Sequence, residues 1–446
     1  MSTDPRSVPV STTNAAALDL FEEALQQYQT YVGDAVATLD RAIAAQPDFV
    51  LAHAARAGVL MTFGEQRFAT QALDSVVAAE ALVDRANERE RGIVAACRML
   101  VDGDWNAACV AFDRVLVENP RDIFTIQTAH LFDFFRGDTL NLRNRVTRVL
   151  PAWDESVPGY SFVLGMYAFG LEENNQYAEA LATAYRALAI EPRDAWSVHA
   201  GVHVMEMRGE IDAGVDWLAT RELHWVPDNG FAYHLWWHRA LLDLDRGDIT
   251  SVLEIFDRRI YPEPSDLSLQ LIDATALLWR LYVLGDDVGC RFEQLASAWE
   301  AKLDTERGFY AFNDVHAMMA FAATGREAAA GRLLHELNDA ATTRTHTNAR
   351  MAREVGLPVA HAIIAFVQGR YDDVIARLES VRDISNVLGG SHAQRDLLSL
   401  TLVEAALRAG RKSVARHYLA ERTVNRPGSV LGWRLLARAT EPGPAA

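Results

Sequence analysis

Residues 103–120 read GDWNAACVAFDRVLVENP, and this stretch decides the fold. A glycine and an aspartate open it, an apolar-periodic segment follows, and a proline closes it. Glycine adopts the left-handed backbone conformation after a helix without a Cβ clash, and the polar residue that follows can begin another helix. Since proline cannot continue a helix, the stretch predicts a single helix that begins after a turn and ends before Pro120.

The same arrangement recurs along the chain at intervals of 34 to 44 residues. An asparagine pair at 174–175 takes the place of one turn glycine. The other turns contain Gly64, Gly103, Gly137, Gly209, Gly247, Gly285, Gly325, Gly369 and Gly410. Because one helical hairpin cannot bury its apolar stripe alone, successive hairpins must stack on one another. The sequence therefore predicts an all-α fold, a right-handed α-solenoid of about ten helix-turn-helix repeats.

Small and large apolar residues stand at fixed distances before the closing prolines. Counting back 12 and 8 residues from Pro120 gives Ala108 and Phe112. The segments 34–47, 175–192 and 410–427 repeat this order of a small residue, an apolar residue and a proline. Small residues let two helices approach closely and larger ones fill the groove between them. We expect the two helices of each hairpin to pack at these positions.

These offsets resemble those of tetratricopeptide repeats, which place Ala, Phe and Pro at the same positions. Four strings are more specifically similar to the tetratricopeptide repeat protein 38 family: HAGVHVMEMRG (199–209), FAYHLWWHRALLDLD (231–245), FNDVHAMMAFAATG (312–325) and GGSHAQRD (389–396). The likeness covers nearly the whole chain. It implies a superhelix whose first helices face the concave surface, and it brings no established chemistry with it.

We expect one superhelical domain over residues 15–440, with flexible segments at 1–14 and 441–446. The 43 Lys and Arg against 60 Asp and Glu give a net charge of −17, which disfavours binding to nucleic acid or to an anionic membrane. The start, MSTDPRSVPVSTTN, lacks the features of a signal peptide, and three scattered cysteines suit no disulfide framework, so a cytoplasmic location is expected. The exposed ends of a solenoid are compatible with a homo-oligomer.

Residues 196–238 concentrate histidine and tryptophan, with five of the 13 histidines and five of the ten tryptophans. Two HxxxH pairs, His199/His203 and His234/His238, lie in neighbouring predicted first helices. Residues four apart share one helix face, and Glu206 follows on the face of His203. Such pairs can hold a divalent metal, or supply a general base with an orienting carboxylate. Histidines that only pack between helices explain the same pattern, so these interpretations stay open.

Further candidates lie toward the C-terminus. His316 falls in a predicted first helix, and GGSHAQRD contains His392, Arg395 and Asp396. Two glycines and a serine there begin a helix whose exposed N–H groups can hold an anion, with Arg395 adding a permanent positive charge. An ordinary serine cap explains the same string equally.

Our leading hypothesis is a polar pocket in the concave groove that binds a small, anionic or carboxylate-bearing ligand. His203 and His238 would transfer protons or contact the ligand, Glu206 would orient them, and Arg395 would anchor the ligand. The other proposed ligand-binding residues are His199, His234, His316, His392 and Asp396. One alternative is a metal-assisted hydrolase that uses both HxxxH pairs, and another is a scaffold that holds a peptide or protein in the groove. No nucleophile elbow, CxxC or dinucleotide-binding motif occurs. The cofactor stays unknown, and no residue is assigned as a metal ligand.

Overall fold

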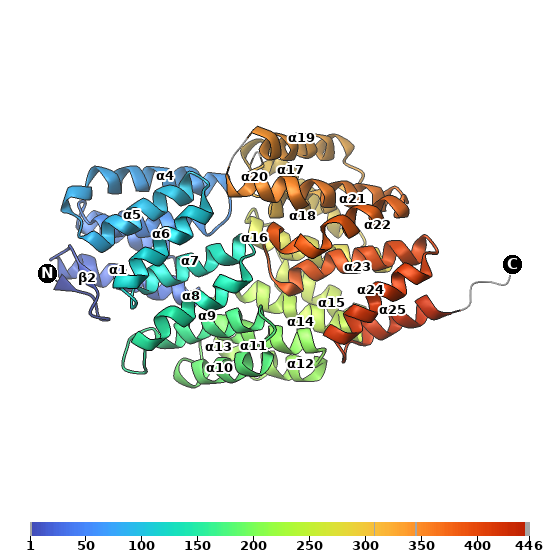
Figure 1. Cartoon of the computed structure of the whole chain (residues 1–446), viewed down its shortest axis with the longest axis horizontal. Coiled ribbons are helices and arrows are strands. Elements are labelled where there is room, and N and C mark those ends of the chain that lie inside the picture. Colours follow the sequence, from blue (N-terminus) through green and yellow to red (C-terminus); the bar gives the residue numbers. More distant parts are fainter. Residues whose placement is uncertain (1, 307, 344–345, 442–446) are drawn as a thin grey trace. The chain divides into compact units, whose positions relative to one another are not determined.

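The computed structural model describes residues 2–306, 308–343 and 346–441, which divide into two compact units. Unit 1 comprises the residues up to 201 together with 221–232, and unit 2 comprises 202–220 and the residues from 233 onward. Apart from one short hairpin of strands, the regular elements of the described residues are helices (Figure 1). The predicted all-α class is confirmed.

The elements that lie wholly in unit 1 are β1 (Ser2–Thr3), β2 (Pro9–Val10), α1 (Ala15–Thr30), α2 (Ala35–Ala45), α3 (Val50–Met61), α4 (Gln66–Ala81), α5 (Glu88–Val101), α6 (Trp105–Glu118), α7 (Ile123–Phe135), α8 (Thr139–Val149), α9 (Tyr160–Glu172), α10 (Tyr177–Ile190) and α13 (Glu222–Trp225), with short 3-10 helices at Val83–Arg85 and Leu150–Ala152. Helices α11 (Ala195–Arg208) and α14 (Ala232–Arg246) cross the boundary between the units.

Unit 2 further contains α12 (Ile211–Ala219), α15 (Ile249–Ile255), α16 (Ser268–Leu284), α17 (Arg291–Glu306), α18 (Ala311–Ala323), α19 (Glu327–Thr343), α20 (Thr347–Met351), α21 (Leu357–Val367), α22 (Tyr371–Val381), α23 (His392–Arg408), α24 (Lys412–Asn425) and α25 (Val430–Thr440), with π-helical turns at Phe256–Ile260 and Ala352–Gly356 and a 3-10 segment at Arg382–Leu388. The second π-helical turn lies between α20 and α21, within the longest interval of the repeat, 325–369.

The predicted glycine turns join the two helices of each hairpin. Gly103, Gly137 and Gly247 have positive φ angles of 83°, 65° and 89°. Asn175 replaces glycine with a φ of 60°, because asparagine tolerates the left-handed conformation. The N–H that follows the left-handed residue donates to the carbonyl five positions earlier, which closes the first helix. These bonds measure 2.8–3.0 Å and are donated by Asp104, Asp138, Gln176, Glu210, Asp248, Asp286, Arg326, Arg370 and Arg411.

Polar caps and prolines set the ends of the second helices. The side chains of Asp104, Asp138 and Asp248 accept N–H groups from the first turns of α6, α8 and α15 at 2.9–3.1 Å. Such a cap pairs a backbone donor that the helix itself leaves unsatisfied. The closing prolines stand two residues after the ends of α2, α6, α10 and α24, and they are Pro47, Pro120, Pro192 and Pro427. The predicted helix-turn-helix repeat is confirmed.

The first helices form the core, whereas the second helices are buried on one face only. Almost every residue of α7, α9 and α18 is buried, but buried residues recur every three to four positions in α6, α8 and α22. In unit 1, α9 packs against α8 and α10, and in unit 2, α18 packs against α16 and α21. Polar side chains on first helices are therefore buried and require partners within the core.

The N-terminal residues, expected to be flexible, form a β-hairpin in which β1 and β2 pair antiparallel. Arg6 in its turn is buried and contacts Asp4 at 2.8 Å and Glu22 of α1 at 2.6 Å. Of the tail expected at 441–446, residues 442–446 lie outside the described part. Among the described helices, none combines the length and the apolar character needed to cross a bilayer.

The turn before α25 packs closely against the glycine turn that ends α11. A Cβ atom on Gly428 would lie 2.3 Å from the carbonyl oxygen of Gly209, a backbone atom held by its own turn. We expect Gly428→Ala to lower the free energy of unfolding of unit 2 by about 1–3 kcal/mol, seen as a lower Tm in calorimetry. Gly331→Ala in α19 is the matched control, because a Cβ there meets nothing within 4 Å. Alanine favours a helix, so this control should keep or raise the Tm, and an equal loss in both variants contradicts the prediction.

Candidate functional site

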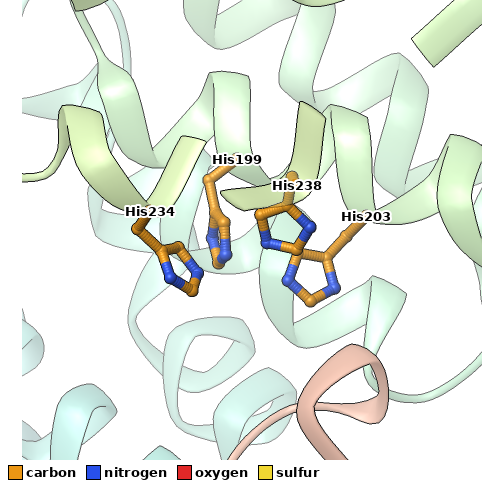
Figure 2. Close-up of side chains that lie close together, drawn as sticks. All are labelled: His199, His203, His234 and His238. Carbon is orange, nitrogen blue, oxygen red and sulfur yellow. The ribbon is translucent and has the colours of Figure 1, made fainter. Parts of the chain in front are cut away.

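Three of the predicted histidines form one cluster inside unit 2. His203 lies on the C-terminal half of α11, and His234 and His238 lie one turn apart on α14. The ring centroids are 4.4 Å apart for His203 and His238 and 4.9 Å apart for His234 and His238 (Figure 2). One ring nitrogen from each of the three lies within 4.8 Å of the other two, and all three side chains are buried. We call these three residues the histidine cluster.

Two members of the histidine cluster are bonded to carboxylates through Nδ1. Nδ1 of His238 lies 2.8 Å from Oε2 of Glu206 on α11, and Nδ1 of His234 lies 2.6 Å from Oδ2 of Asp273 on α16. When a carboxylate accepts the Nδ1 proton of a neutral imidazole, the lone pair of that ring is on Nε2. The two carboxylates thereby select the tautomer and fix the orientation of both rings.

Burial sets the protonation of this site. It lowers the pKa of His203 and His238 well below the usual range, and the neighbouring imidazoles act in the same direction. Burial raises the pKa of Glu206 to about 7, while Arg426 and Arg280 act against this increase. Above pH 7, the ionised Glu206 therefore accepts a proton from a neutral His238.

Arginines of α16 and α24 surround the carboxylates. Arg422 forms a two-pronged ion pair with Asp396 of α23, and Arg426 lies 3.4 Å from Asp396 and 3.7 Å from Glu206. Arg280 is buried and donates to two backbone carbonyls, at 3.0 and 2.6 Å. The arginines hold the pKa of Asp396 far below its usual range, although burial acts in the opposite direction. The result is a buried network of charges beside the histidine cluster.

A small cavity lies within this network. It measures about 20 Å³, and its charged lining consists of Glu206, Asp245, Arg280, Asp396, Arg422 and Arg426. A water molecule needs roughly 10–15 Å³ by this measure, whereas pockets for drug-sized ligands measure about 300–1,000 Å³. The cavity therefore has room for one water, and a larger ligand requires the lining side chains to move.

Two other predicted site residues pack against aromatic rings. His199 lies in the unit 1 part of α11, with its ring 4.9 Å from that of Trp196 and 5.0 Å from that of Phe169. His316 on α18 donates from Nδ1 to the carbonyl of Phe312 at 2.8 Å, and burial lowers the pKa of His316 to about 4. Both histidines therefore contact aromatic residues, and their predicted part in ligand binding stays a prediction.

The string GGSHAQRD begins α23. Ser391 caps this helix, since its hydroxyl accepts the N–H of Gln394 while the Gln394 side chain accepts the N–H of Ser391. Arg395 donates to a backbone carbonyl of the preceding loop, and His392 is half-buried. The cluster and its charged surroundings bring together the predicted residues His203, Glu206, His234, His238 and Asp396. Arg395 instead donates to the carbonyl of Gly390, and His316 donates to the carbonyl of Phe312.

Four residues of the site were not predicted from the sequence: Asp273, Arg280, Arg422 and Arg426. The first two had a signal, because α16 reads SLQLIDATALLWRLYVL and its interior has one acid and one base seven positions apart. Residues seven apart share a helix face, and charges in an otherwise apolar helix need buried partners. Arg422 on α24 and Arg426 directly after it had no such signal, since they lie in a largely polar segment that also contains the exposed Arg416.

No protein-family model matches the chain. Among solved structures, the chain is similar to one of the APC/C hetero-tetramer Cut9–Hcn1 with 12% identity and a TM-score of 0.42, over 95% of this chain and 76% of that one. It is similar to the human IFIT1 dimer with PPP-AAAA at 14% identity and a TM-score of 0.37, over 94% and 98%. The P58(IPK) TPR domain has 15% identity and a TM-score of 0.21, over 89% and 98%. Similarities this low assign neither a family nor a function.

The pair of Asp396 with Arg422 tests the buried network. We expect Asp396→Asn to lower the free energy of unfolding by about 3–5 kcal/mol, because it leaves buried guanidinium groups without their carboxylate. Asp372→Asn removes the carboxylate from an exposed pair with Arg411 and should change stability by about 1 kcal/mol or less. Because the pKa of Asp396 is lowered in the fold, the difference between wild type and Asp396→Asn should shrink as the pH falls below about 4. Denaturation by urea at several pH values measures both effects, and a difference that is constant with pH contradicts them.

Proposed function

We propose that this chain is an interaction scaffold of tetratricopeptide type, which binds a peptide segment of a partner protein on the second helices of unit 1. Helical hairpin repeats offer extended surfaces for such contacts. The first helices are buried, so the side chains available to a partner lie mainly on the second helices. The proposal is carried by an open apolar groove on these helices.

Each second helix from α4 to α10 exposes large apolar side chains. Single exposed apolar residues are normal on protein surfaces, whereas a concave patch of them indicates a binding site. Val117 of α6 is 75% exposed, the highest value on these four helices. The others are Leu73, Val77, Val110, Leu140, Tyr185 and Ile190.

A groove of about 490 Å³ lies between the C-terminal ends of α6 and α8. Its apolar lining consists of Leu116, Val117, Pro120, Val149, Pro151 and Ala152. Arg145 and Arg148 line it as well, and both form ion pairs with the third charged residue of the lining, Asp113. Arg148 is half exposed, so it can exchange this pair for a carboxylate of a partner. An apolar floor beside an accessible arginine favours a peptide that has an apolar side chain and a nearby acid.

A library of peptides displayed on phage, selected with the full chain, tests this function. We expect the selected peptides to combine Leu, Ile or Phe with Asp or Glu, and to bind the Val117→Glu variant at least tenfold more weakly. Val77→Glu on α4 is the matched control, since Val77 is 51% exposed but does not line the groove. A failure to select any peptide, or equal binding to wild type and Val117→Glu, contradicts the proposal.

We propose as a second candidate function the binding of a small anion beside the histidine cluster, and this retains the pocket expected from the sequence. The observation that favours it is Arg280. Among the described residues, no carboxylate lies within 4.0 Å of this guanidinium, and burial lowers its pKa to about 10. Asp396 and Glu206 compensate its charge only from a distance, so an anion that entered the cavity would stabilise the cation.

Thermal unfolding in the presence of phosphate or succinate tests this second candidate. We expect either anion to raise the Tm of the wild type and to leave the Arg280→Gln variant unchanged. Arg395→Ala distinguishes the two possible anchors of the anion. If Arg395 is the anchor, as the sequence predicted, this variant loses the rise in Tm. If Arg280 is the anchor, as the buried network favours, this variant keeps it. No rise in the Tm of the wild type rejects the anion site.

Other expectations from the sequence stay predictions. These are membership of the tetratricopeptide repeat protein 38 family, a cytoplasmic location, a homo-oligomer and metal-assisted hydrolysis. The hydrolase alternative requires a bound metal ion.

A further inference from the structure

We propose that the histidine cluster binds a divalent transition metal, zinc above all, with His203, His234 and His238 as its three protein ligands. Catalytic zinc sites commonly have three protein ligands and leave a fourth position open. Each histidine of the cluster offers one ring nitrogen within 4.8 Å of the other two. In a tetrahedral site with Zn–N bonds of 2.0–2.1 Å, the nitrogens lie about 3.4 Å apart, so zinc binding draws the three ring nitrogens to this separation.

The carboxylates behind the rings are the second observation that points to a metal. Histidines that bind metals almost always donate their other ring N–H to a carboxylate, a carbonyl or a water. The Nδ1 atoms of His238 and His234 lie 2.8 Å from Glu206 and 2.6 Å from Asp273. This arrangement leaves Nε2 as the ligand atom on both rings. Both pairs belong to the same cluster and orient its rings in the way that metal ligands require.

The helices hold the cluster rigidly. His234 and His238 lie one turn apart on α14, and His203 and Glu206 lie on the same part of α11, three positions apart. Side chains at these spacings share one face of a helix, so two helices are sufficient to present three imidazoles and one supporting carboxylate. Asp273 comes from the buried interior of α16. Sites on helices hold ligand geometry better than sites on loops.

The donor set decides which metals suit this site. Imidazole nitrogens favour Zn²⁺, Ni²⁺ and Cu²⁺, whereas Mg²⁺ prefers oxygen ligands and an octahedral geometry. The carboxylates of Glu206 and Asp273 favour a cation, while Arg280 and Arg426 oppose it. The proposal commits to Zn²⁺, with Mg²⁺ as the ion that should not bind.

Titration of the chelator-treated full chain with Zn²⁺ tests the proposal, with bound zinc measured by mass spectrometry and the Tm by calorimetry. We expect one zinc per chain and a higher Tm, both lost in His203→Ala and His238→Ala. Co²⁺ in place of zinc should give the visible absorption of a tetrahedral site. His316→Ala is the matched control, because it removes another buried histidine of unit 2 and should keep the zinc.

A substitution of Glu206, which bonds to the proposed ligand His238, distinguishes a loss of metal binding from a loss of folding. Glu206→Gln keeps all three imidazoles and should weaken zinc binding by about 10–100-fold without abolishing it. A wild type without stoichiometric zinc, or zinc that His238→Ala retains, overturns the proposal. Mg²⁺ binding with equal affinity also overturns it. Selection of peptides by the groove of unit 1 does not depend on any of these outcomes, so the two proposals fail separately.

Discussion

The left-handed turn between paired helices is the constraint on which the rest of the structure depends. At nine turns, the N–H after the left-handed residue donates to the carbonyl five positions earlier. This bond ends one helix and directs the chain back along it, so each repeat becomes an antiparallel hairpin. Glycine supplies the conformation at most turns, and Asn175 supplies it where glycine is absent. Because the turn is local, it forms in every repeat independently of what the repeat packs against.

Stacking of such hairpins determines where polar groups are buried. A first helix is packed between its own second helix and its neighbours, so polar groups on its inner faces are removed from water. Removing an imidazole or a carboxylate from water is unfavourable unless a partner compensates for it. His238 with Glu206 and His234 with Asp273 meet this requirement in pairs. In the histidine cluster, the partners come from first helices packed side by side, so α11, α14 and α16 together supply the imidazoles and their carboxylates.

The sequence predicted the repeats much better than the site, because the two depend on interactions of different range. Turn glycines, capping aspartates and Pro120 determine the backbone only within a few residues of themselves. Their effects can therefore be predicted from the sequence alone. The HxxxH pairs were recognised for the same reason. Asp273 and Arg426 come from helices far along the chain, and only tertiary packing brings them to His234 and Glu206. The string 389–396 is distinctive in the sequence, but several of its polar groups bond close by in the chain. Ser391 and Gln394 cap α23, and Arg395 donates to the carbonyl of Gly390.

The charges around the cluster connect its two proposed ligands. Three arginines and four carboxylates of unit 2 lie around the imidazoles or line the neighbouring cavity, namely Arg280, Arg422, Arg426, Glu206, Asp245, Asp273 and Asp396. With these groups ionised, the four carboxylates exceed the three arginines by one negative charge. A bound Zn²⁺ would add two positive charges and would favour the ionised form of Glu206. The network would then carry an excess positive charge, which a bound anion would compensate. Binding of metal and of anion should therefore each strengthen the other.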